Sequence, residues 1–126
     1  MGGARDLLIA IGLLGFAAAF VTGGWPLIRQ PAPRAAQARA AGLPVNDVFV
    51  RANGVAMILL VALVVIVPGL RAAAALLLAL QLLPITYAGH RFWTIEPGPP
   101  RNAQRVSFFK NVSLIGAALA IAGYSG

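Results

Sequence analysis

The strongest constraint on the fold is a set of four long apolar segments that carry almost no charge. They occupy about residues 6–24, 47–67, 71–89 and 106–124. About 20 apolar residues in an α-helix are enough to cross the hydrocarbon core of a bilayer. Because lipid offers the backbone no hydrogen bonds, segments of this kind cross it as helices. The sequence therefore predicts an all-α integral membrane protein.

Composition agrees with this prediction and sets the number of domains. The chain has 126 residues, of which 60% are hydrophobic and 10% charged, whereas about a quarter of a soluble domain is charged. We expect one transmembrane domain over residues 1–126, an up-down-up-down four-helix bundle. The first segment has an alternative interpretation as a cleaved signal peptide that begins at Arg5. Asp6 and the three later spans favour an uncleaved helix.

The polar loops of this bundle are expected at residues 25–46 and 90–105. Within the first, "PRAAQARAAG" suits either a short helix at the lipid surface or a solvated loop. Asn46 or Asp47 can cap the second helix. Asp47 and Arg51 are spaced to pair on that helix.

The basic residues predict which way the protein faces. Net charge is +7, and the basic residues lie in short segments between the apolar runs, which is typical of membrane flanks rather than of nucleic-acid binding. Eight of them fall in the connections 25–51 and 89–111, and only Arg5 and Arg71 lie on the other side. By the positive-inside rule, we expect both termini outside and the loops 25–51 and 89–105 in the cytoplasm of a bacterium.

This topology brings polar residues from separate segments to one depth. The start of the second span, the end of the third and the start of the fourth all lie at the inner boundary. Polar side chains at membrane depth are costly unless they have partners or face a cavity, so they are functional candidates. The candidate ligand-binding residues are His90, Trp93, Lys110, Asn111, Asn53 and, deeper in the membrane, Gln81.

Each candidate also has a structural interpretation. Lys110 can reach the interface or pair with Asp47 or Glu96, and Asn111 can bond to Asn53 across the bundle. His90 is the one side chain here that titrates near neutral pH without perturbation. Trp93 suits the interfacial aromatic belt, and Gln81 suits a hydrogen bond between helices.

The chain lacks the residues that several kinds of chemistry require. There is no cysteine, which excludes disulfides, cysteine-ligated zinc and iron–sulfur clusters. One histidine and three acids make no metal-site pattern, and no nucleophile–base pair or cofactor motif stands out. Four glycines would permit close helix packing, within the chain or in a homo-oligomer: Gly12, Gly15, Gly116 and Gly123.

Two late motifs resemble a known family. "AGHRFW" closes the third span and "RNAQRVSFFKNVSLIGAAL" leads into the fourth. The pattern His-x-Phe-Trp followed by Phe-x-Lys-Asn-x-x-x-x-Gly is similar to that of the DoxX family of small four-helix membrane proteins. "VRANG" and the hairpin that follows it also fit, and the likeness is weakest over residues 1–24.

The resemblance implies a role in redox metabolism. DoxX-like proteins resemble the membrane subunit of thiosulfate:quinone oxidoreductases, and some relatives belong to a complex with a superoxide dismutase and a sulfurtransferase. In this chain His90, Trp93, Lys110 and Asn111 match the motif. Many members carry a Glu early in the second span, where this chain has Asn53, so proton transfer at that position is in doubt.

Two functions therefore stay open at this level. The first is a redox-associated subunit that binds a quinone-like or other small apolar ligand near the cytoplasmic interface. The second is a non-catalytic anchor that holds soluble redox or sulfur-transfer enzymes at the membrane. Whether the chain itself catalyses a reaction does not follow from the residues.

Topology mapping tests the convergence of the candidates. Single cysteines placed beside Arg34 and beside Arg101 should react with a membrane-impermeant maleimide from the same side of the bilayer. The cysteine-free chain supplies a clean background. Labelling of the two positions from opposite sides would contradict the expected number of crossings.

Overall fold

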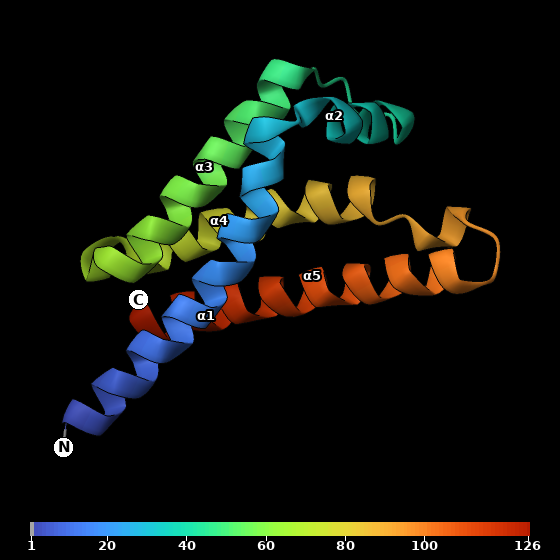
Figure 1. The fold of residues 1–126 in the computed structure, drawn as a ribbon. Coiled ribbons are helices and arrows are strands. Elements are labelled where there is room, and N and C mark those ends of the chain that lie inside the picture. Colours follow the sequence, from blue (N-terminus) through green and yellow to red (C-terminus); the bar gives the residue numbers. More distant parts are fainter. Residues whose placement is uncertain (1) are drawn as a thin grey trace.

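The computed structural model describes residues 2–126, which form helices and connecting turns without a strand (Figure 1). The α-helices are α1 (Gly2–Arg29), α2 (Pro31–Ala40), α3 (Asp47–Ile66), α4 (Arg71–Gly89) and α5 (Pro99–Ser125). Short 3-10 turns, η1 (Pro68–Leu70) and η2 (Phe92–Thr94), lie on either side of α4. Four helices are long and apolar enough to cross a bilayer. The all-α fold is confirmed, and it fits an integral membrane protein.

The four long helices pack as two pairs. Helix α1 packs along α3, and α5 packs along α4, while the α3–α4 hairpin joins the pairs. Figure 1 shows both termini toward one end of the molecule, and α2 beside the opposite ends of α1 and α3. The largest fully buried side chains are Phe20, Leu78, Val61 and Val64, so the core lies where the two pairs meet.

The helices extend further into the expected loops than the apolar pattern indicates. Helix α1 continues to Arg29, although a loop was expected from residue 25. Residues 31–40 form a helix, so the segment "PRAAQARAAG" is helical and not an irregular loop. Helix α5 begins at Pro99 rather than near residue 106, so the expected loop 90–105 is partly helical. Apolarity marks the part of a helix in contact with lipid and misses its polar ends.

Local chemistry explains where two of the helices begin. Gly98 precedes α5 with a φ of 144°, a conformation that favours glycine. Pro99 then starts the helix where a missing N–H costs no hydrogen bond. At α3, Asn46 Oδ1 accepts a hydrogen bond from the Phe49 N–H at 2.8 Å, which confirms the expected cap.

Arginine side chains complete the ends of two long helices. Arg51 Nε donates to Ile28 O at 3.0 Å, near the last turn of α1. Arg71 Nε donates to Val64 O at 2.6 Å, in the last turn of α3. The last carbonyls of a helix lack partners within it, so these bonds satisfy groups that would otherwise be costly in lipid. The expected pairing of Arg51 with Asp47 does not form: among the described residues no ion pair joins these two side chains, and Arg51 bonds to Ile28 O instead.

Helices α1 and α3 approach each other closely at Gly24 and Gly54. A Cβ added at Gly54 would lie 2.7 Å from Gly24 O and 2.8 Å from Leu27 Cβ. No side chain larger than hydrogen fits there unless the helices separate. Four glycines were expected to make such contacts: Gly12, Gly15, Gly116 and Gly123. A Cβ added at any of them would have no neighbouring heavy atom within 4 Å, so that prediction is wrong within the chain.

Adjacent glycines in α1 give a matched test of this contact. Gly24→Ala would bring a methyl group 3.1 Å from Ile58 Cγ1 and 3.2 Å from Gly54 O, and should destabilise the protein by about 1–3 kcal/mol. Gly23→Ala is the control, because its nearest neighbour would be Met57 Sδ at 4.0 Å. Thermal unfolding in one detergent should lower the midpoint for Gly24→Ala only. Equal midpoints for both variants would contradict the proposed contact.

Candidate ligand-binding site

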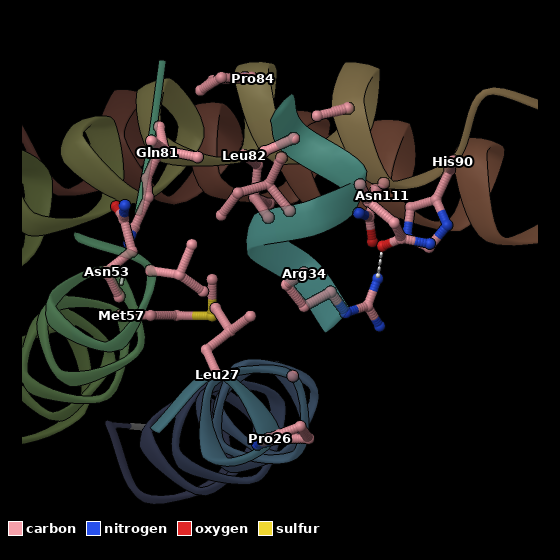
Figure 2. A pocket seen from close by; sticks show the side chains of 18 of the residues that line it. Pro26, Leu27, Arg34, Asn53, Met57, Gln81, Leu82, Pro84, His90 and Asn111 are labelled. Carbon is pink, nitrogen blue, oxygen red and sulfur yellow. Dashed lines mark hydrogen bonds between the residues drawn. The ribbon is translucent and has the colours of Figure 1, made fainter. Parts of the chain in front are cut away.

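A cavity of about 560 Å³ lies between the two helix pairs and is lined by side chains from all five α-helices (Figure 2). This volume is within the range of small-molecule sites. Much of the wall is apolar and comes from four helices: Phe20, Leu27, Met57, Leu82, Ile85 and Leu114. The cavity therefore has room and apolar surface for the body of a small molecule.

Five of the six residues singled out from the sequence line this cavity. They are Asn53 of α3, Gln81 of α4, His90 at the end of α4, and Lys110 and Asn111 of α5. These positions come from three separate segments of the chain. The structure thus brings together the side chains that the expected topology placed at similar depths.

Trp93 lies outside the cavity lining, in an aromatic cluster. Its ring centroid is 5.3 Å from that of Phe92 and 5.7 Å from that of Phe108, both in edge-to-face geometry. The Tyr87 ring lies 6.0 Å away. Such contacts stabilise the turn between α4 and α5. The sequence indicated that the segment around Trp93 lies near the other candidates. It did not predict the direction of the indole ring, because the 3-10 turn η2 changes the direction of the chain there.

The amide pair in the cavity wall differs from the one expected. Gln81 Nε2 donates to Asn53 O at 2.7 Å and to Asn53 Oδ1 at 3.2 Å. This contact joins the neighbouring helices α3 and α4, whereas Asn111 lies on α5, which packs on α4 instead. No hydrogen bond joins Asn111 to Asn53 among residues 2–126, although Asn111 is buried. The deeper amide therefore helps to hold the hairpin together.

His90 follows the last residue of α4 and is oriented by α5. Its Nδ1 lies 2.8 Å from Gln104 Oε1. Because an amide oxygen only accepts hydrogen bonds, Nδ1 carries the proton in this pair. The other ring nitrogen, Nε2, has no hydrogen-bond partner among the described residues. A neutral His90 held in this way presents Nε2 as an acceptor, and a protonated one presents it as a donor.

Arg34 is a cavity residue that the sequence reasoning did not select. Its segment was expected either at the lipid surface or in solvent, whereas α2 folds back and carries Arg34 to the cavity wall. Arg34 Nη1 donates to Gln37 Oε1 at 3.3 Å and would lie 3.4 Å from a Cβ at Gly89. Positions 34, 37 and 38 share a helix face and all line the cavity. This spacing could have indicated from the sequence that Arg34 shares a helix face with Gln37 and Ala38.

A second, shallower depression adjoins the cavity on the side of the α4–α5 connection. It is lined in part by Pro100, Ala103 and Gln104 at the start of α5. Four residues line both spaces: Arg34, Gln37, His90 and Ser107. The wall between the cavity and the depression is therefore polar.

The cavity is electrostatically positive. Arg34 and Lys110 each contribute one positive charge to its lining, and no acid lines it among the described residues. The expected ion pairs of Lys110 with Asp47 or Glu96 do not form in the described part of the chain. Both cations lie close enough to His90 for their charges to act on it. The site thus combines positive charge, hydrogen-bonding groups and an apolar wall.

Fold and cavity together fit a small all-α membrane protein with a cavity of ligand size. Comparison with known proteins adds no relative: no family model, no curated protein and no solved structure matches this chain. The assignment of the site therefore depends on its own geometry.

The ring state of His90 tests the geometry of the wall. Because His90 is the one histidine in the chain, its ring nitrogen signals can be assigned without ambiguity in ¹⁵N-labelled protein. Neutral His90 should carry its proton mainly on Nδ1, and Gln104→Leu should reduce the fraction of this tautomer because the acceptor is lost. Gln104→Glu, which keeps an acceptor, should retain it. A tautomer ratio that is the same in all three proteins would contradict the contact.

Proposed function

We propose that the protein is a DoxX-like, redox-associated membrane subunit that binds a small amphiphilic, quinone-like molecule in the cavity between its helix pairs. The observation that carries the proposal is the meeting of His90, Lys110 and Asn111 on one cavity with a wall of Phe20, Leu82 and other apolar side chains. A quinone has the same division between a polar head and an apolar body.

The motif residues support the family proposal as well as the ligand. His90 belongs to the first motif that resembles the DoxX pattern, and Lys110 and Asn111 belong to the second. His90 and Lys110 lie 20 residues apart in the sequence, yet three polar side chains of the two motifs line one space. A ligand site is one physical reason for both motifs to occur in the same chain.

Quinone chemistry needs a proton at the ligand oxygen, and His90 is suited to exchange it. Reduction of a quinone takes up protons at its oxygens, and oxidation of the quinol releases them. A histidine can transfer a proton in either direction. Burial lowers the pKa of His90, which favours the neutral ring that can accept a proton. His90 also lines the adjoining depression, where Gln104 holds its ring, so the proton has a path away from the apolar wall. Electrons would come from a partner, for which soluble redox or sulfur-transfer enzymes are the candidates.

The orientation belongs to the same proposal. The wall shared by the cavity and the depression lies at the end of the bundle that carries the connections rich in basic residues. With those connections in the cytoplasm, the ligand head would lie near the cytoplasmic interface. A soluble partner that delivers electrons would then approach from that side.

Binding of a quinone analogue tests the proposal directly. Purified protein in lipid nanodiscs should bind a fluorescent short-chain quinone analogue, and His90→Ala and Lys110→Ala should each weaken binding about tenfold, because each removes a hydrogen bond to the polar head. Arg101→Ala, which removes a charge outside the cavity lining, serves as the control.

Unchanged affinity in both cavity variants would rule out this site.

The anchor function predicts a different result for the same variants. Recovery of a soluble partner in mild detergent would survive His90→Ala and Lys110→Ala but fail when the exposed loop arginines are replaced.

A further inference from the structure

Arg34 differs from other arginines of the chain in what its side chain binds. Four arginines each donate to a main-chain carbonyl oxygen: Arg39, Arg51, Arg71 and Arg91. Among the described residues, the Arg34 guanidinium donates only to Gln37 Oε1, a neighbour on its own helix. A guanidinium has five N–H donors in a planar fork that matches a carboxylate or phosphate. Arg34 therefore keeps most of its donors for a partner at the cavity.

Lys110 adds a second cation to the cavity lining from a different helix. Arg34 comes from α2 and Lys110 from α5, so the two charges reach the cavity from separate elements. The lining contains these two positive charges and, within residues 2–126, no negative one. Both side chains are exposed. Two positive charges at one cavity repel each other, and a bound anion relieves this repulsion.

Arg34 and Lys110 both lie near His90, whereas much of the remaining wall is apolar. Figure 2 shows Arg34, His90 and Asn111 together, with Leu27, Met57 and Leu82 between them and the Asn53–Gln81 pair. A free inorganic anion would use the cations but leave the apolar wall without a partner. The shape and chemistry of the cavity suit a molecule with both parts.

We infer that the cavity recognises an anionic amphiphile, a molecule with a carboxylate or phosphate head on an apolar chain or ring. The head lies between Arg34 and Lys110, where bidentate and charge-assisted hydrogen bonds are available. The apolar part lies against Leu27, Met57 and Leu82. This inference goes beyond the proposed function, because it concerns the same cavity but assigns its ligand a negative charge that a neutral quinone lacks.

Matched probes separate the head group from the chain. The experiment uses the full protein in zwitterionic nanodiscs, with empty nanodiscs to subtract partitioning into lipid. The probes are dansyl-undecanoic acid and its methyl ester, which share a chain and a fluorophore but differ in charge. The acid should bind at least about tenfold more tightly than the ester, the ratio expected from one charge-assisted contact.

Charge-removing variants locate the effect. Arg34→Gln and Lys110→Gln should each reduce affinity for the acid about five- to tenfold and leave affinity for the ester unchanged. Arg105→Gln is the control, since it removes the same charge from α5 at an exposed position outside the cavity lining. Inorganic phosphate should not displace the acid at concentrations where dodecanoate does.

The outcomes distinguish this inference from the proposed function. Equal binding of acid and ester, with displacement of both by the quinone analogue, overturns the anionic head but leaves the quinone-like ligand. Binding of the acid that the quinone analogue cannot displace supports the inference and contradicts the quinone. Displacement by inorganic phosphate alone would show a simple anion site, and absence of binding by every probe would overturn both.

Discussion

The close approach of α1 to α3 at Gly24 and Gly54 sets the arrangement on which the rest of the structure depends. With main chains this close, α1 is held against α3. Helix α5 packs along α4, so each long helix has one main partner. The two pairs meet in the core but do not fill all the space between them. What remains is the cavity, and α2 supplies one of its walls.

Much of this could be predicted from the sequence, for reasons of length and polarity. Apolar segments long enough for a bilayer fix the number of helices, and an even number of crossings places Asn53, His90 and Lys110 at similar depths. Other features depend on tertiary packing. The side on which Trp93 points, the pairing of Gln81 with Asn53 and the inward fold of α2 are set by neighbours that hydropathy does not identify. The glycines that matter lie at a helix crossing, and spacing alone did not distinguish them from Gly12 or Gly116.

Arginine has two roles in this protein, and they explain why its count is an incomplete guide to function. Arg51 and Arg71 satisfy carbonyl groups near helix ends, a structural task that any membrane helix presents. Arg34 lines the cavity and makes no such bond among the described residues. All three add to the charge balance that predicts orientation, so topology and recognition draw on the same residue type.

Helix α5 is the longest element after α1 and runs from Pro99 to Ser125. At 1.5 Å per residue it extends about 40 Å, which exceeds the roughly 30 Å of hydrocarbon in a bilayer. Its first turns, with Gln104, line the outer depression, while Lys110 further along lines the cavity. Because one continuous helix carries both groups, the separation between Gln104 and Lys110 is set by helix geometry and not by a loop.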